Sequence, residues 1–189
     1  MLILLSLFFA ILIFLLALLW IVVPAFYGPP SVPTNAHRIR KALQLAELKP
    51  NERFYDLGAG DGRVLLIAAR EFDAQATGIE IGPVQCALIR LRAATGGLGN
   101  RIKIKWQNYL KSDLKDADVV FLYATSKEVN RLAAHLVNTM KPGSRLVSIS
   151  ADFPEWQPST MDKQNLIFVY VMPPKAGSMA TYLMKQIND

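Results

Sequence analysis

Hydrophobic and polar positions divide this chain into two unequal parts. From residue 2 to residue 23 the sequence reads LILLSLFFAILIFLLALLWIVV, and Ser6 is the only polar residue in it. As an α-helix rising about 1.5 Å per residue, this run would span roughly 33 Å, the thickness of the hydrocarbon core of a bilayer. Trp20, Phe26 and Tyr27 are expected to form an aromatic belt at the membrane interface.

A cleaved signal peptide is the main alternative for this segment. Such a peptide normally has a basic N-terminal region and an apolar run of about 7–15 residues. Here the run is longer and no basic residue precedes it. A buried core helix fits less well, because it would normally show a polar stripe. The pattern therefore favours an uncleaved transmembrane anchor over residues 1–27, with Pro24 ending its helix.

A proline-rich linker at residues 28–33 and a domain at residues 34–189 follow the anchor. The only charge before the apolar span is the terminal amine, whereas His37, Arg38, Arg40 and Lys41 follow it. Positive residues stay on the inner side of a membrane. The domain is therefore expected to face the cytoplasm, or the mitochondrial matrix in a eukaryote.

The domain alternates between helical and strand-like patterns. A helix is expected from Thr34 or Asn35, with Ile39, Leu43 and Ala46 on its inner face. Strands are expected at residues 54–57, 76–80, 102–106, 118–123 and 145–150, with helices at residues 63–72, 84–94 and 127–140. This alternation predicts an α/β fold with a parallel sheet and helices on both faces.

The C-terminal pattern differs from the rest of the domain. Residues 166–172 and 181–187 both read as strands, and the gap between them is too short for a crossover helix. Strands joined by so short a connection pair antiparallel. The expected fold is therefore a mostly parallel sheet that ends in an antiparallel hairpin.

Charge and cysteine content narrow the classes of partner. All 36 charged residues lie from Arg38 onward, so the net charge of +6 belongs to the domain. A basic surface can meet anionic lipid, nucleic acid or acidic protein. There is no run of Arg or Lys, so nucleic acid is not expected as a partner. Cys86 is the only cysteine, which excludes a disulfide framework, and no metal site is expected.

A glycine-rich turn follows the first expected strand. The sequence DLGAGDGR places Gly58, Gly60 and Gly62 between that strand and a helix. Glycines let the backbone turn sharply and approach a ligand closely, and the helix presents unpaired N–H groups. Glu80 ends the next strand, 20 residues after Gly60, where a carboxylate can accept hydrogen bonds from ribose hydroxyls. Together these features predict a nucleoside cofactor at the carboxyl edge of the sheet.

The spacing of the glycines distinguishes between nucleoside cofactors. A dinucleotide site prefers G-x-G-x-x-G, and the third glycine of that pattern is replaced here by Arg63. The G-x-G-x-G spacing, the preceding Asp56 and the terminal hairpin resemble class I methyltransferases. That resemblance implies a Rossmann-like, seven-stranded sheet and S-adenosyl-L-methionine as the cofactor.

The same resemblance implies roles for individual residues. Asp56 would orient the turn and the methionine amino group, and Glu80 would hold the ribose. Asn108 stands where the family usually has an acidic residue near the adenine amino group, and its amide oxygen can still accept that bond. The cofactor-binding residues implied in this way are Thr34, Asp56, Gly58, Ala59, Gly60, Gly62, Glu80, Ile81, Asn108 and Tyr109.

A narrower resemblance rests on five segments. These are VPT at 32–34, YDLGAGDGR at 55–63, DVVFLY at 118–123, TMKPG at 139–143 and DFPEWQP at 152–158. In this order they resemble the small membrane-anchored lysine methyltransferases of the adenine nucleotide translocase and of the ATP synthase c subunit, and their bacterial relatives. Gly82 departs from the pattern, because that family usually has Asn before the proline. The resemblance implies a protein-lysine N-methyltransferase that acts on a membrane-associated protein.

The residues that would meet the methyl acceptor are less well defined. The expected candidates, at the carboxyl ends of the fourth and fifth strands, are Tyr123, Thr125, Asp152 and Trp156. Three of them also have a structural alternative: Tyr123 can end a buried strand, Asp152 can cap a turn, and Trp156 can belong to the core or to a lid. Two other functions stay open, a methyltransferase for a lipid or quinone-like molecule and a non-catalytic module that binds the cofactor.

Overall fold

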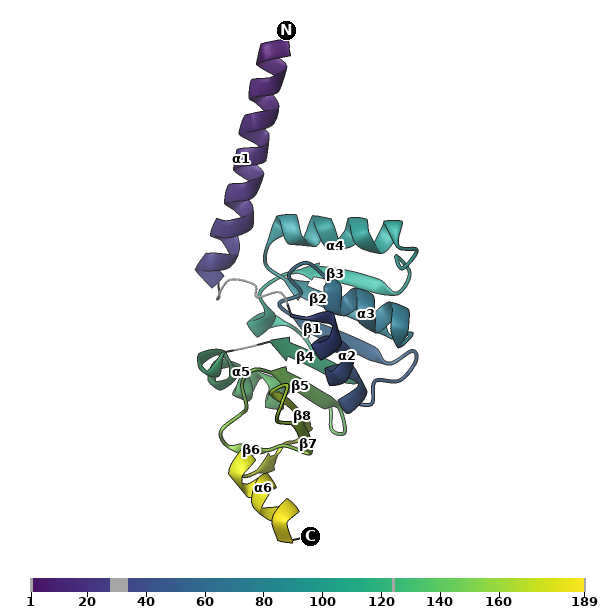
Figure 1. Cartoon of the computed structure of the whole chain (residues 1–189), viewed down its shortest axis with the longest axis vertical. Coiled ribbons are helices and arrows are strands. Elements are labelled where there is room, and N and C mark those ends of the chain that lie inside the picture. Colours follow the sequence, from purple (N-terminus) through teal and green to yellow (C-terminus); the bar gives the residue numbers. More distant parts are fainter. Residues whose placement is uncertain (1, 28–33, 124, 189) are drawn as a thin grey trace.

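The computed structural model describes residues 2–27, 34–123 and 125–188, so the expected linker at residues 28–33 lies outside the described residues. Helix α1 (Leu2–Tyr27) projects from one end of an α/β domain (Figure 1). Its first part, Leu2–Leu19, has a mean hydropathy of 3.3 and none of it is buried. By length and composition this helix can cross a membrane, as expected. The expectation that Pro24 ends the helix is wrong, because α1 continues to Tyr27. A proline removes one hydrogen bond, and apolar spanning helices tolerate that loss.

Seven strands form one mixed sheet in the order β3-β2-β1-β4-β5-β8-β7. The first five of these run parallel to one another. They are β3 (Ile102–Trp106), β2 (Gln75–Glu80), β1 (Arg53–Leu57), β4 (Val119–Tyr123) and β5 (Arg145–Ile149). β8 (Ile167–Val171) is antiparallel to both of its neighbours, β5 and β7 (Thr160–Asp162). Two short strands, β6 (Trp156–Gln157) and β9 (Lys175–Ala176), pair separately.

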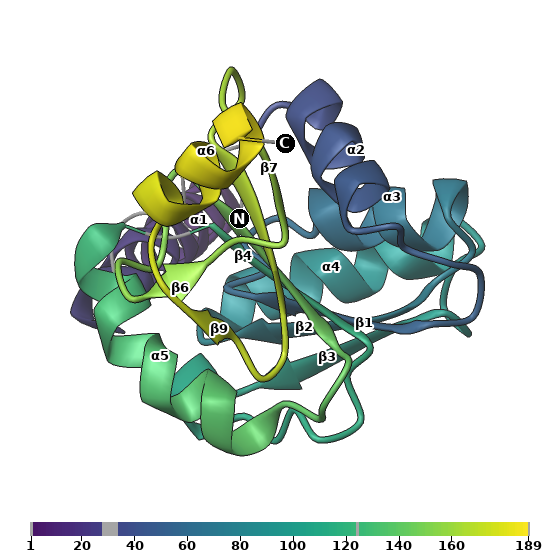
Figure 2. The same ribbon diagram turned by 90° about the horizontal axis from the view of Figure 1, so that it is seen from below.

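Helices cover both faces of the sheet, which confirms the expected layering (Figure 2). On one face lie α2 (Ala36–Leu45), α3 (Arg63–Glu71) and α4 (Pro83–Thr95), which share one hydrophobic core with the sheet. On the other face α5 (Ser126–Thr139) encloses a second core, and the short 3₁₀ helix η1 (Tyr109–Lys111) lies at its margin. The expected inner residues of α2, namely Ile39, Leu43 and Ala46, are all buried.

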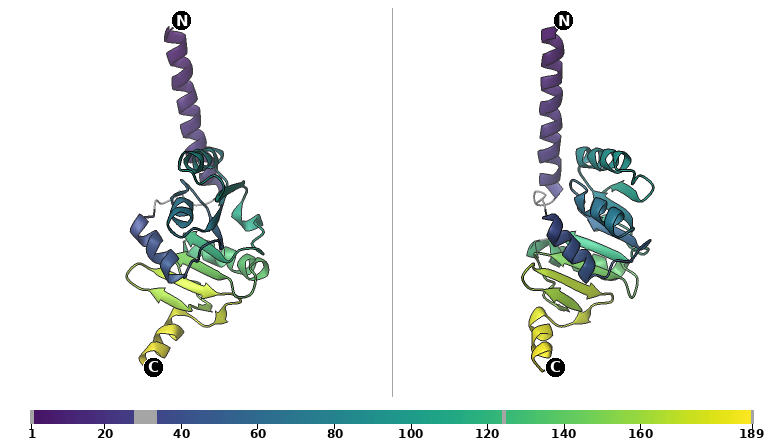
Figure 3. Two further views of the ribbon diagram at one scale, coloured as in Figure 1. Left: turned by 90° about the vertical axis from the view of Figure 1, so that its right-hand side faces the viewer. Right: turned by 45° about the vertical axis from the view of Figure 1, so that its right-hand side comes forward.

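The expected C-terminal hairpin is wrong in one of its strands. Residues 181–187 lie in helix α6 (Met179–Asn188), at the end of the molecule opposite to α1 (Figure 3). The helix starts after Ser178, whose hydroxyl accepts a hydrogen bond from the amide of Thr181. The antiparallel partner of β8 is instead β7, which precedes it. Asp162 closes that turn by accepting hydrogen bonds from the amide and the side chain of Asn165.

Candidate functional site

The glycine turn lies between β1 and α3 at the carboxyl edge of the sheet. Gly58, Gly60 and Gly62 have φ values of +85°, +54° and +79°, which L side chains rarely adopt. The amides of Gly58 and Ala59 both donate to the carbonyl of Ile79, so the turn is bound to the end of β2. A Cβ atom added at Gly58 would meet no atom within 4 Å. The backbone here is therefore open to the close approach of a ligand, as the motif predicts.

Two other glycine positions are required by packing. A Cβ on Gly62 would lie 2.7 Å from the Ile89 side chain of α4, below any normal contact distance. A Cβ on Gly78, in the middle of β2, would lie 2.6 Å from Leu65 of α3. Sequence reasoning missed Gly78, although a glycine inside a strand often marks a close approach. These glycines let α3 and α4 pack tightly enough to hold the turn in place.

Glu80 is the centre of the site. Its side chain is buried at the end of β2, and one carboxylate oxygen accepts a hydrogen bond of 2.7 Å from the amide of Gly60. The other oxygen accepts from the amides of Ile81 and Gly82 at 2.9 and 2.7 Å. The expected proximity of Glu80 to the glycine turn is confirmed. A carboxylate has about four acceptor sites, so it can accept from ribose hydroxyls as well.

Asp56 lies one residue before the end of β1 and is 3% exposed. Burial, together with the nearby carboxylates of Glu80 and Asp61, raises the pKa of its carboxyl to about 8. No hydrogen bond to this carboxyl is present among the described residues. A nearby cation stabilises the ionised form of such a buried carboxyl, and an ammonium group such as that of methionine can supply this charge.

Arg63 links the turn to the start of α2. Its guanidinium forms an ion pair with Asp61 at 2.8 Å and donates to the backbone carbonyl of Thr34 at 3.2 Å. Burial acts to raise the pKa of Asp61, but the hydrogen bonds from Arg63 and Arg92 outweigh it and lower that pKa. Thr34 is buried beside the turn, and Asn35 rather than Thr34 caps α2 by accepting from the amide of His37.

Asn108 and Tyr109, both expected to bind the cofactor, make hydrogen bonds within the protein. The side-chain oxygen of Asn108 accepts from the amide of Leu110 at 2.9 Å and so caps η1. The Tyr109 hydroxyl donates to Glu128 of α5 at 2.9 Å, and burial together with that bond raises the tyrosine pKa to about 12. Contact of either residue with a cofactor stays a prediction.

Tyr123 and Thr125 lie at the carboxyl end of β4, where the acceptor was expected. Tyr123 is half-buried, and the Arg38 guanidinium lies 5.9 Å from its ring centroid. Thr125 is the N-cap of α5, and both its amide and its hydroxyl donate to Glu128. Sequence reasoning missed Glu128, which receives bonds from Tyr109 and Thr125 and so joins the two halves of this edge. A Glu three residues after a threonine was the available signal.

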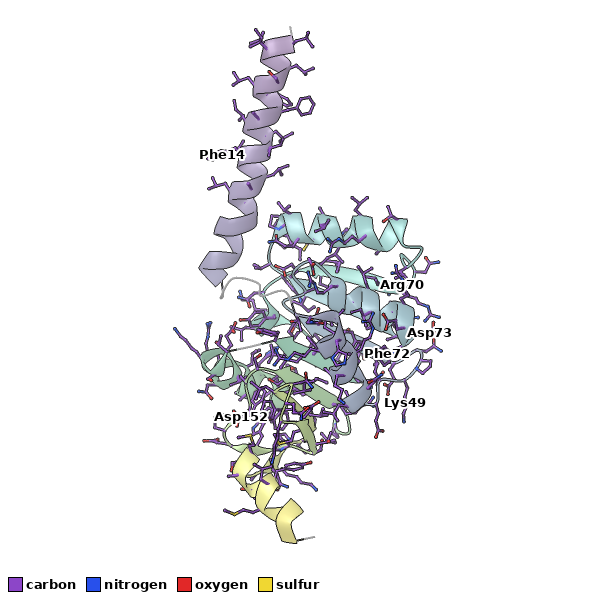
Figure 4. All side chains as sticks on the ribbon, in the orientation of Figure 1. Phe14, Lys49, Arg70, Phe72, Asp73 and Asp152 are labelled. Carbon is purple, nitrogen blue, oxygen red and sulfur yellow. The ribbon has the colours of Figure 1, made fainter. Side chains whose placement is uncertain are left out.

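Asp152 and Trp156 follow β5, and they differ in burial and packing. Asp152 is half-buried at the side of the domain (Figure 4). Trp156 is 8% exposed and stacks on Phe153 with ring centroids 4.2 Å apart. Both rings pack edge-on against Tyr170 of β8. Trp156 is thus part of a core, and its burial does not support contact with the methyl acceptor. That contact stays a prediction.

Comparison with known proteins also indicates a methyltransferase. A model of the ANTKMT methyltransferase domain matches residues 56–160. A protein-lysine N-methyltransferase from Saccharolobus islandicus is 29% identical over 150 residues, which cover 76% of this chain and 93% of that enzyme. The mouse adenine nucleotide translocase lysine N-methyltransferase is 29% identical over 136 residues, 72% of this chain and 59% of the mouse enzyme.

A solved structure agrees with the fold. The RNA methyltransferase from Salinibacter ruber, in complex with S-adenosyl-L-homocysteine, superposes with a TM-score of 0.73 at 29% identity. The match covers 77% of this chain and 97% of that one. Among the described residues, no group of three or more His, Cys, Asp or Glu side chains could hold a metal ion.

Proposed function

This chain belongs to the ANTKMT methyltransferase domain family and is an S-adenosyl-L-methionine-dependent methyltransferase, and on that premise we propose that it methylates a lysine side chain of a membrane-associated protein. The S. islandicus and mouse relatives carry lysine methylation in their names, and the mouse enzyme is named for a translocase. These relatives support the proposed acceptor class.

One observation carries the membrane part of the proposal. Only residues 28–33 separate α1 from Thr34, and so short a segment reaches at most about 25 Å. The carbonyl of Thr34 accepts a hydrogen bond from Arg63, the first residue after the glycine turn. A domain anchored by α1 would therefore hold its cofactor site close to the bilayer, within reach of a lysine at the membrane surface.

The residues of the site suit the bound cofactor. S-adenosyl-L-methionine supplies an electrophilic methyl group on a sulfonium sulfur. Asp56 would bind its amino group, the open backbone at Gly58 would admit its methionine tail, Glu80 would hold the ribose, and Asn108 would receive the adenine amino group. The acceptor lysine must lose its proton before it reacts. A dry edge near the positive sulfonium would lower the lysine pKa from its usual value of about 10.4.

The charges that follow α1 support an orientation. His37, Arg38, Arg40 and Lys41 lie on the domain side of the span, and no basic side chain precedes it. By the positive-inside rule the domain would face the cytoplasm, or the mitochondrial matrix in a eukaryote.

The proposal is tested with the full chain reconstituted into membranes of its source cells and given methyl-labelled cofactor. We expect label in a membrane protein band whose acid hydrolysate contains methyllysine, and loss of that label with Glu80→Gln. Glu71→Gln, at the far end of α3, is the matched control and should keep the label. Label that extracts with lipid, or that ribonuclease releases, would overturn the proposed acceptor.

A further inference from the structure

The positive charge of this protein is concentrated in one segment. Residues 81–112 contain no Asp or Glu and six basic residues, namely Arg90, Arg92, Arg101, Lys103, Lys105 and Lys111. The remaining 15 basic residues balance the 15 acidic ones, so this segment accounts for the whole net charge of +6. It comprises α4, the edge strand β3, which α4 contacts, and η1.

The outer face of α4 is apolar. A helix that covers a sheet in water normally turns a polar face outward. Here Ala87, Leu91 and Ala94 are exposed at successive turns, and Leu91 keeps 61% of its surface accessible. Arg90 lies beside them, and α4 contains no acidic residue. A helix with an apolar stripe flanked by cations is typical of one that lies in the surface of a bilayer.

The neighbouring edge strand extends this surface. Trp106 at the end of β3 is 64% exposed, and its indole nitrogen donates to the carbonyl of Ile81 at 2.8 Å, which fixes the ring. Tryptophan with one anchored polar group and an exposed ring favours membrane interfaces. Lys103 and Lys105 are exposed on the same strand but alternate with Trp106, so they flank the sheet edge on the face opposite to α4, where the Lys105 ammonium lies 5.3 Å from the ring centroid of Tyr55. Among the described residues neither lysine forms an ion pair.

The position of α1 indicates what covers this surface. Helix α4 contacts α1 and lies crosswise to it, at the end of the domain from which α1 rises (Figures 1 and 3). If α1 crosses the bilayer, the α4 and β3 edge is the part of the domain that faces the headgroups. Basic side chains near a leaflet that contains anionic lipid are attracted to it.

We propose that the outer face of α4 and the edge strand β3, with Leu91, Trp106, Arg90, Lys103 and Lys105, form a docking surface for the anionic surface of the bilayer that holds α1. This surface gives the domain a second contact with the membrane and sets the direction in which its carboxyl edge opens. The inference rests on α1 as a membrane anchor and not on the identity of the methyl acceptor. A second copy of the chain and RNA are the competing occupants.

The test uses the full chain with the Cys86→Ala background, reconstituted by α1 into vesicles. A fluorophore is attached through Ala94→Cys on the outer face of α4, or through Ala134→Cys on α5 as the matched control, since both alanines are exposed on helices. Vesicles of phosphatidylcholine, with or without phosphatidylglycerol, carry a quencher at headgroup depth. Retention of cofactor binding shows that each labelled protein is folded.

We expect quenching at position 94 to exceed that at position 134 by at least about twofold in the anionic vesicles, and to weaken at high salt. The triple variant R90E/K103E/K105E should lose the difference and still bind the cofactor. Equal quenching at the two positions would overturn the proposal. So would quenching at position 94 that follows protein density rather than lipid charge, protection of that position by added RNA, or failure of the chain to remain with the vesicles. Loss of lysine methylation alone would affect only the proposed function.

Discussion

The carboxylate of Glu80 accepts a 2.7 Å hydrogen bond from the backbone amide of Gly60, which joins the end of β2 to the glycine turn after β1. The same carboxylate receives the amides of Ile81 and Gly82. One buried acid therefore shapes the turn and the start of the loop before α4. Any cofactor that lies across these two strand ends must contact elements that Glu80 already holds together.

Replacement of Glu80 with Gln should weaken cofactor binding. The amide keeps the size of the side chain but loses its charge, and its NH₂ group opposes one of three backbone donors. Hydrogen bonds to a charged group contribute about 1.5–3 kcal/mol, so we expect the dissociation constant to rise by about 10- to 100-fold. Isothermal titration with S-adenosyl-L-methionine measures this. Glu71→Gln removes only an exposed ion pair with Arg40 and should bind normally. Equal affinities for the two variants would contradict this role for Glu80.

The pKa of Asp56 predicts a pH dependence of stability. Because its folded pKa is raised from 3.8 to about 8, the folded protein keeps a proton that the unfolded chain has lost between these values. The stability supplied by this group is thus fully present below pH 3.8 and falls as the pH rises toward 8. In Asp56→Asn this decline should be smaller. Calorimetry measures the change in Tm between mildly acidic and mildly basic buffers, and this change should be smaller in the variant than in the native protein by at least about 3 °C. Parallel Tm profiles for the two proteins would rule out the raised pKa.

The proposed ion pair between Asp56 and the methionine amino group adds a second consequence. Near neutral pH the free protein holds Asp56 largely protonated, and an arriving ammonium group favours its ionised form. Cofactor binding should therefore release up to about one proton at pH 7. Titrations in two buffers with different ionisation enthalpies measure the release, and Asp56→Asn should lower it. Equal release by the variant and the native protein would show that the proton comes from a group other than Asp56.

Gly58 and Gly62 should respond differently to alanine. Both have a positive φ, which costs an L-residue about 1–2 kcal/mol. At Gly62 the new methyl group also meets Ile89 at 2.7 Å, and overpacking adds about 1–3 kcal/mol. Gly62→Ala is therefore expected to be the less stable variant in urea unfolding. Gly58→Ala places its methyl group in open space at the site, so it should lose more cofactor affinity than its stability loss explains. The opposite ranking in stability would show that the turn rearranges.

Tyr170 should stabilise the segment that carries Asp152. Its buried hydroxyl oxygen accepts a hydrogen bond of 3.0 Å from the amide of Phe153, and its ring packs against Phe153 and Trp156. In Tyr170→Phe the rings stay but the amide loses its acceptor, at a cost of about 1–3 kcal/mol. Urea unfolding measures this loss, and hydrogen exchange at residue 153 should accelerate. Unchanged exchange with unchanged stability would show that water replaces the hydroxyl.

Much of the domain could be predicted from local patterns. The parallel strands and the helices between them follow from runs of apolar residues with periods of two and 3.6, and the structure reproduces them to within one or two residues. The turn at Gly58 and its distance along the chain from Glu80 were likewise readable, because both lie at the ends of adjacent parallel strands. Helix α1 is recognisable because no charge interrupts its apolar run.

The sequence by itself therefore determined the order of the elements, the cofactor turn and the apolar span, since each depends on residues that are close together in the chain. The tertiary structure decided what depends on distant partners. It gave β8 the partner β7 in place of residues 181–187, buried Trp156 against Tyr170, and required glycine at position 78 because Leu65 lies against it. It also raised the pKa of Asp56, since burial and neighbouring charge exist only once the sheet has formed.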